Sequence, residues 1–259
     1  MNAIITLTTD FGRKDAYTGA MKGVILGINP AARIVDLSHE IEPQNISEGS
    51  FVLASAYPYF PKGTVHVAVV DPGVGSGRKI LCVKTRSAYF LAPDNGLLTP
   101  VLDAEKSCVV RQISNRQFFR KEISPTFHGR DILASVAGWL SKKDVFPRLG
   151  PKAGNLKRLP WPAVKRLRTE VKGEILSTDH FGNLITNIRA SDLRGNAGWR
   201  RVQAGRFIIT ARGKCYADGK PGRVMALLNS MDYLEIAVPN GSAAALTGLR
   251  PGREVTVTP

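Results

Sequence analysis

The fold class of this chain is decided by the stretch Thr64-Val65-His66-Val67-Ala68-Val69-Val70-Asp71-Pro72-Gly73-Val74-Gly75-Ser76-Gly77-Arg78. Apart from one histidine, its first seven residues are apolar or β-branched, which is typical of a strand buried within a sheet. The strand runs into an Asp-Pro-Gly turn signal. The glycines that follow let the backbone reverse tightly, so the turn can bring Arg78 back toward Asp71.

Strands and helices alternate around this buried strand. We expect further strands at 4–9, 33–37, 80–84 and 89–92, and helices at 17–28, 45–57 and 129–140. This β-α-β-α-β order predicts an α/β domain built on an open sheet flanked by helices. Residues 147–162 are rich in Gly, Pro, Lys and Arg, and we interpret them as a linker or a surface crossing.

The second part of the chain has a different texture. Short strands are expected at 173–177, 184–188, 206–210, 224–228 and 254–257, with no long helix between them. Such a pattern predicts a small barrel or sandwich. We therefore divide the chain into an α/β domain, residues 1–160, and a smaller all-β domain, residues 161–259.

Composition excludes several classes of protein. The 259 residues are 43% hydrophobic and 22% charged, which excludes intrinsic disorder as the main state. No apolar run approaches the roughly 20 residues that a membrane helix needs. The first ten residues lack the features of a secretory signal, and the three cysteines are odd in number and far apart. We expect a cytoplasmic protein without disulfides.

The formal net charge of +15 is the one unusual value. Such a charge is found in proteins that bind nucleotides or RNA, so a basic nucleotide- or RNA-binding protein is an alternative function. The basic residues form no tail and no block of like charges, which favours a diffuse positive surface over nucleic-acid binding. Binding of nucleic acid through phosphate contacts should weaken steeply as the salt concentration rises, which tests this alternative.

Three segments place polar residues where ligands of α/β sheets bind, at the ends of strands. Asp10 follows the first strand, where it could bind a ribose diol or cap the following turn. Asp71 and Arg78 could form a site or a structural pair that supports the loop. His128 stands one residue before an expected helix, and a lone histidine of this kind is more often a structural residue than a catalytic one.

Several well-known motifs are missing from the sequence. There is no P-loop, no Gly-x-Gly-x-x-Gly fingerprint and no Gly-x-Ser-x-Gly elbow. No His-x-x-x-His pair or cysteine spacing suits zinc. We therefore expect neither a metal nor a cofactor.

Taken together, the polar segments resemble the S-adenosyl-L-methionine hydrolase (hydroxide adenosyltransferase) family, which is related to the fluorinase and the chlorinase. The resemblance rests on six ordered motifs: Thr6–Gly12, Val70–Gly75, Ala92–Gly96, Phe127–Asp131, Phe181–Asn183 and Asn229–Ala243. It implies an α/β domain, a C-terminal β-barrel and a homotrimer with active sites between subunits. It also implies hydrolysis of S-adenosylmethionine to adenosine and methionine by water or hydroxide that attacks ribose C5′.

The resemblance also assigns roles to individual residues. The catalytic set falls on Asp71, Arg78 and His128, and which of them takes the proton stays open. A halide-dependent adenosyltransferase is the alternative enzyme, and the presence of this set disfavours it because halogenating relatives lack it. For the substrate, the resemblance implies that Asp10 binds the ribose. It implies that Asp179 and Ser230 hold the methionine amino and carboxylate groups, with Asn183 and Glu235 nearby. Tyr216 is implied to stack on adenine, with a core tyrosine as the alternative, and the backbone near Val238 to meet the adenine edge.

Overall fold

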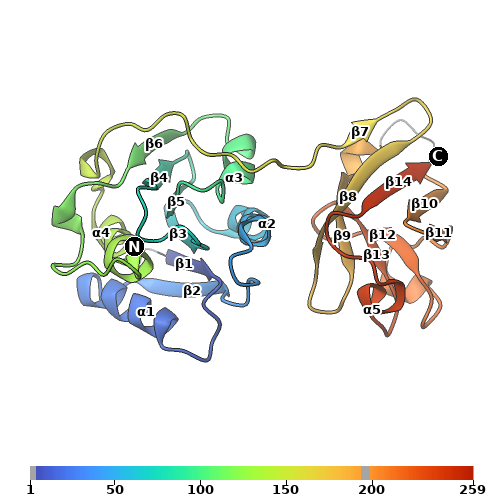
Figure 1. Ribbon diagram of the computed structural model, residues 1–259, viewed down its shortest axis with the longest axis horizontal. Helices are drawn as coiled ribbons and strands as arrows, with labels where there is room; N and C mark the ends of the chain where they lie inside the picture. Colours follow the sequence, from blue (N-terminus) through green and yellow to red (C-terminus); the bar gives the residue numbers. More distant parts are fainter. Residues whose placement is uncertain (1–3, 194–198, 259) are drawn as a thin grey trace. The chain divides into compact units, whose positions relative to one another are not determined.

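The protein folds into two compact units, Met1–Pro160 and Trp161–Pro259. The structure, a computed structural model, describes residues 4–193 and 199–258. Figure 1 follows the chain from the first unit, in blue and green, to the second, in yellow and red. No helix among these residues is long and apolar enough to cross a membrane.

The first unit is built on a six-stranded mixed sheet in the order β2-β1-β3-β5-β4-β6. Its strands are β1 (Ile4–Thr9), β2 (Arg33–Ser38), β3 (Thr64–Val69), β4 (Ile80–Lys84), β5 (Ala88–Pro93) and β6 (Val109–Gln112). Strands β2, β1, β3 and β5 are parallel, whereas β4 runs antiparallel to both of its neighbours. The β-α-β-α-β start of the chain is thus as predicted.

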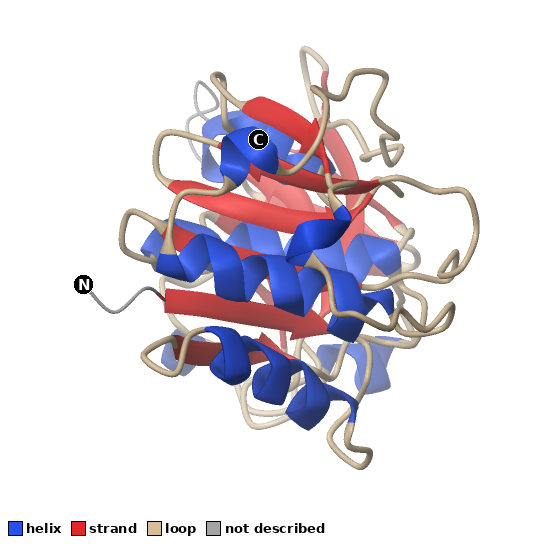
Figure 2. Cartoon of the chain, turned by 90° about the vertical axis from the view of Figure 1, so that its left-hand side faces the viewer, coloured by secondary structure: helices blue, strands red, loops and turns tan. Residues whose placement is uncertain are grey.

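Helices cover both faces of this sheet. They are α1 (Tyr17–Ile28), α2 (Ile46–Ala56), α3 (Thr99–Ala104) and α4 (Ser135–Lys142), the last continuing a π-helix over Gly129–Ala134. Figure 2 shows helices packed in front of the sheet of this unit and running roughly along its strands. Alternate residues of β3 explain the two layers, because Val65, Val67 and Val69 join a core with α1 and α4, whereas Ala68 joins the core with α2 and α3. The predicted α/β class is confirmed.

The segment 147–162 is a surface crossing that is anchored to the first unit. Lys152 forms a β-bridge with Arg111. Farther along, Lys157 N–H donates to Asp94 Oδ1 (2.9 Å) and Leu159 N–H donates to Thr99 Oγ1 (2.9 Å). The interpretation of this segment as a linker is therefore wrong up to Leu159, because its backbone bonds to the sheet end and to α3.

The second unit is an antiparallel, nearly closed barrel-like sheet in the order β11-β10-β14-β8-β9-β13-β12, and β7 pairs with β8. A bridge between Arg212 and Ala226 adds a further contact at the β12 edge. Its elements are β7 (Lys165–Arg166), β8 (Val171–Thr178), β9 (Leu184–Arg189), β10 (Arg201–Ala204), β11 (Phe207–Ile209), β12 (Met225–Leu228), β13 (Tyr233–Ala237), α5 (Ala243–Thr247) and β14 (Glu254–Thr258). Inward-facing residues such as Ile175, Leu184 and Leu234 form one buried core. This confirms the predicted all-β barrel.

Candidate active site

A cavity of 690 Å³ opens in the first unit, where the ends of β1 and β3 meet the start of the π-helix. Ligands of open α/β sheets bind at this edge because the parallel strands end there and loops diverge. Three of the residues singled out from the sequence line it: Asp10, Asp71 and His128.

Arg78 holds Asp71 and His128 together. The Arg78 Nε donates to both carboxylate oxygens of Asp71 at 2.7 Å, and its Nη2 also contacts Asp71 Oδ2. The same Nη2 donates to His128 Nδ1 at 3.0 Å. The Asp71 and Arg78 side chains are only 6% and 5% exposed. The contact expected from the glycine-rich turn is therefore present, and it includes the histidine.

The contact with Arg78 defines the protonation of His128. A guanidinium can only donate, so Nδ1 must be the unprotonated nitrogen and Nε2 carries the proton of the neutral ring. Burial and the positive charge of Arg78 lower the pKa of His128, while Asp71 and Asp131 act in the opposite direction. His128 is thus a neutral donor through Nε2. Its Nδ1 is already occupied by Arg78, whereas the Asp71 carboxylate retains lone pairs that can accept a further hydrogen bond.

Gly75 allows the turn after β3 to pack closely against the loop before His128. Its φ is +82°, and a Cβ there would lie 2.7 Å from the carbonyl oxygen of Pro125. A side chain is excluded by both the backbone conformation and the space. The glycine pattern of the sequence is thus what seats the Asp71–Arg78 turn against the His128 loop.

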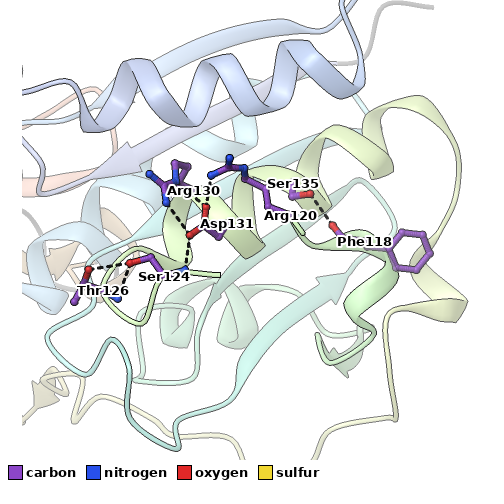
Figure 3. A network of polar contacts seen from close by, with 7 residues as sticks. All are labelled: Phe118, Arg120, Ser124, Thr126, Arg130, Asp131 and Ser135. Atoms are coloured by element: carbon purple, nitrogen blue, oxygen red, sulfur yellow. Dashed lines mark hydrogen bonds and ion pairs between the residues drawn. The ribbon is translucent and has the colours of Figure 1, made fainter. Parts of the chain in front are cut away.

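Asp131 anchors that loop from behind (Figure 3). Its fully buried carboxylate accepts hydrogen bonds from Arg130, from Arg120 Nη1 (2.8 Å) and from the backbone N–H of Ser124 (2.8 Å). Burial raises the pKa of Asp131, but the hydrogen bonds from Arg130, Ser124 and Arg120 outweigh it and lower the pKa to about 2. The ionised Asp131 therefore joins the loop before His128 to the π-helix after it, a helix type that is frequent at functional sites.

Asp10 points across the cavity edge. Its Oδ2 accepts a hydrogen bond from the backbone N–H of Gln44 (2.9 Å), a cavity residue with a φ of +66°. The turn after β1 is held instead by Gly12 N–H, which donates to the carbonyl of His39. Asp10 thus fastens a strained neighbouring loop, and the turn-capping alternative has no support here. Among the described residues, none donates a hydrogen bond to its Oδ1.

The sequence reasoning missed the aromatic part of the cavity. Phe11, Tyr17 and Phe127 pack edge to face or tilted, with ring centroids 5.3 to 5.8 Å apart, and all three line the cavity. Phe11 and Phe127 each stand next to a polar residue that the sequence did single out, which was the available signal. Their rings offer an apolar surface beside the carboxylates of Asp10 and Asp71.

In the second unit, Asp179 organises the turn between β8 and β9. Its Oδ1 accepts from the N–H groups of Phe181 (2.9 Å) and Asn183 (2.8 Å), and its Oδ2 accepts from Asn183 Nδ2 (2.9 Å). The structure thus brings Asp179 and Asn183 into direct contact. Such a carboxylate has further lone pairs for a ligand ammonium group.

Tyr216, Glu235 and Asn229 form a second polar group in the same unit. Glu235 accepts from Tyr216 Oη (2.8 Å) and from Asn229 Nδ2 (3.1 Å). Burial raises the pKa of Glu235 against the lowering effect of these bonds, and burial together with Glu235 raises the pKa of Tyr216 to about 12. Tyr216 is 46% exposed, so the alternative of a core tyrosine is wrong. Asn229 was not among the residues singled out individually.

The last two expected residues differ in their surroundings. Ser230 is exposed in the turn between β12 and β13. Val238 is 5% exposed, its side chain lies in the barrel core, and its carbonyl accepts from Gly241 N–H at 3.0 Å. The side chain of Val238 is therefore part of the core and is not available to a ligand. Within residues 4–193 and 199–258, no group of three or more His, Cys, Asp or Glu side chains could hold a metal ion.

Comparison with known proteins identifies the family. The sequence matches the SAM hydroxide adenosyltransferase N-terminal domain over residues 5–150 and the C-terminal domain of the same family over residues 173–256. The chain belongs to the SAM hydroxide adenosyltransferase family. The two compact units follow the order of the two matched domains.

Relatives of known name are similar along almost the whole SAM hydroxide adenosyltransferase chain. The (R)-S-adenosyl-L-methionine hydrolase of Salinispora tropica is 35% identical, with 98% of this chain and 97% of that protein covered. The enzyme of the same name from Methanocaldococcus jannaschii is 39% identical, with coverages of 90% and 88%. The crystal structure of an uncharacterized conserved protein from Thermotoga maritima has a TM-score of 0.93 and 38% identity, with coverages of 99% and 100%. A fluorinase from an Actinoplanes species is less similar, at 27% identity over 99% of this chain and 98% of the enzyme.

Proposed function

We propose that the protein hydrolyses S-adenosyl-L-methionine to adenosine and L-methionine. The observation that carries this proposal is the hydrogen-bonded Asp71–Arg78–His128 set, of which Asp71 and His128 line the same cavity as Asp10. Hydrolases of this name at 35–39% identity support the substrate and the reaction. The free cysteines Cys82, Cys108 and Cys215 support a location in the reducing cytoplasm.

The reaction needs little more than a well-placed nucleophile. A sulfonium is already a good leaving group, so no acid has to protonate the sulfur. One water must lie in line behind the ribose C5′, and positioning of this kind contributes about 7–11 kcal/mol in favourable cases. Asp71 accepts a proton or hydrogen bond from that water, Arg78 fixes Asp71, and the Nε2–H of His128 donates to the developing hydroxide or to the water.

The charges of the cavity suit the substrate. The carboxylates of Asp10 and Asp71 face a ligand whose sulfonium is cationic, and Asp10 retains oxygen lone pairs for the ribose hydroxyls. In the second unit, Asp179 and Ser230 bind the methionine amino and carboxylate groups, with Asn183 and Glu235 nearby. Tyr216 stacks on adenine and the backbone near Val238 meets the adenine edge.

Incubation with S-adenosylmethionine and chromatographic detection of products tests the function. Adenosine and methionine should appear in equal amounts. Parallel reactions with added chloride or fluoride should yield no halogenated nucleoside. A halogenated product would establish the alternative enzyme. If no product formed and the protein bound RNA strongly and in a salt-dependent way, the alternative binding protein would be established.

Loss of the Asp10 carboxylate should weaken adenosine binding more than it slows the chemical step. A charged hydrogen bond is worth about 1.5–3 kcal/mol, so Asp10→Ala should raise the adenosine Kd by about 10- to 100-fold. Calorimetric titration measures this effect. Asp15→Ala, in the loop before α1, is the control and should bind adenosine normally. An unchanged Kd in Asp10→Ala would restrict Asp10 to fastening the Gln44 loop.

We also propose a homotrimer whose active sites lie between subunits, as the family resemblance implies. Asp71→Ala and Asp179→Ala chains should each be inactive alone. Equal mixing of the two should restore about a quarter of wild-type activity, because a cyclic arrangement then contains some sites with two intact faces. Size-exclusion chromatography with light scattering gives the subunit number. Proven subunit exchange without recovered activity would place the whole site within one chain.

A further inference from the structure

We propose that Thr9 and His39 are positioning residues that hold the Asp10 turn for ribose binding. This inference rests on the proposed function, because it assigns the Asp10 turn to substrate binding. Neither residue lines the cavity, and both are buried, with exposures of 0% for Thr9 and 2% for His39. They act on the substrate through the residues between them and the cavity.

Contacts from His39 and Thr9 enclose the turn on both sides of Asp10. Before Asp10, the Oγ1 of Thr9 lies 2.8 Å from His39 Nδ1. After Asp10, Phe11 N–H donates to the same Thr9 Oγ1 at 3.3 Å, and Gly12 N–H donates to the His39 carbonyl at 2.8 Å. The backbone that carries Asp10 and Phe11 into the cavity is thus fastened to one histidine at two points.

Two further groups orient the histidine ring. Its Nε2 lies 3.0 Å from Asp36 Oδ1, and Lys22 Nζ donates to Asp36 Oδ2 at 2.6 Å. Burial raises the pKa of Asp36, but the hydrogen bonds from Lys22 and His39 outweigh it and lower the pKa. The ionised Asp36 attracts a ring proton to Nε2 of His39.

This tautomer gives every group in the chain of contacts a consistent role. With its proton on Nε2, His39 accepts from the Thr9 hydroxyl at Nδ1. The Thr9 oxygen then has lone pairs free to accept the Phe11 N–H. A methyl group in place of the hydroxyl removes both bonds at once, and of the two links to His39 the turn keeps only the one from Gly12 N–H.

A second threonine of β1, Thr6, also pairs with a histidine and provides a matched control. Thr6 Oγ1 lies 2.8 Å from His66 Nδ1, and both residues are buried. The His66 ring stacks on Phe90 at a centroid distance of 5.0 Å, and neither Thr6 nor His66 lines the cavity. Loss of this pair costs stability in the same way as loss of the Thr9–His39 pair, without touching the Asp10 turn.

Three variants test the inference by steady-state kinetics, adenosine calorimetry and thermal melting. Thr9→Val should raise the KM for S-adenosylmethionine and the adenosine Kd about tenfold, with kcat changed less than about threefold. Thr9→Ser retains the hydroxyl and should stay within about twofold of the wild type in both constants. Thr6→Val should lower the Tm about as much as Thr9→Val and leave both constants unchanged.

The inference would be overturned if Thr9→Val and Thr6→Val had the same KM and adenosine Kd. It would also be overturned if Thr9→Ser weakened adenosine binding as much as Thr9→Val. If Thr9→Val does not fold, Asp36→Asn takes its place and should raise both constants at least about threefold. Unchanged values in Asp36→Asn would then overturn it. Absence of hydrolysis by the wild type would overturn the proposed function alone, since adenosine titrations still test the positioning role.

Discussion

Asp71→Asn should lower kcat for S-adenosylmethionine hydrolysis by about 10²- to 10⁴-fold, the range typical for loss of a positioned acid or base. Asn cannot take up the proton, and the Nδ1 of His128, which accepts from Arg78, is not free to replace it. Single-turnover rates with saturating substrate measure this loss. His128→Ala should lose about 10²-fold, the typical effect of removing one donor to a developing anion.

Asp94→Asn is the matched control for this prediction. Asp94 is a buried carboxylate at the end of β5 in the same sheet, it accepts from Lys157 N–H, and it does not line the cavity. Its variant should retain near wild-type kcat, and adenosine should still bind to Asp71→Asn. A kcat in Asp71→Asn close to that of the wild type would refute the assignment of Asp71 as proton acceptor.

Asp131→Ala should lower the free energy of unfolding by about 1.5–3 kcal/mol at pH 7, because it removes a buried carboxylate that accepts charge-assisted hydrogen bonds from two partly exposed arginines. The loss also frees the loop before His128, so kcat should fall as well. Asp103→Ala is the control. It breaks the exposed pair with Arg158 (2.6 Å) and should cost less than about 1 kcal/mol. Urea unfolding of the three proteins gives these values.

The pH dependence supplies an independent check on Asp131. Its folded-state pKa of about 2 lies below the ordinary value of 3.8, so its ionisation stabilises the folded protein above pH 4. That contribution is lost as the pH falls from about 4 toward 2. The stability difference between wild type and Asp131→Ala should therefore shrink over this range. A difference that is constant from pH 7 to pH 2 would contradict the role of charge.

Much of the fold could be predicted because local patterns and tertiary packing agree in the central elements. The helix start at Asn45 is an example, since its side chain accepts from Glu48 N–H and caps α2 as its residue type suggests. Strands β6, β7, β10 and β13 and helix α3 were missed. In β13 the buried Glu235 interrupts an otherwise apolar run, and hydrogen bonds from Tyr216 and Asn229, both outside the strand, make its burial possible.

The site divides along the same line. The glycines before Arg78 indicated its contact with Asp71, because the effect of glycine on a turn is local. The sequence did not indicate which nitrogen of His128 faces Arg78 or that Asp10 bonds to Gln44. Both contacts depend on the packing of segments far apart in the chain. The apolar wall of Phe11, Tyr17 and Phe127 was missed for a similar reason, since isolated aromatic residues are most often core residues.

The anchored crossing at 150–159 has a practical consequence for domain exchange between relatives. The match to the N-terminal domain ends at residue 150, but Lys157 and Leu159 bond to Asp94 and Thr99 in the first unit. A chimera joined at 150 would pair this anchoring segment with the sheet end of another protein. In this chain Gly96 leaves room for Leu159, because a Cβ on residue 96 would lie only 2.8 Å from atoms of Leu159. Chimeras joined after Pro160 keep each anchor with its own partner, and they should be recovered as soluble protein in higher yield.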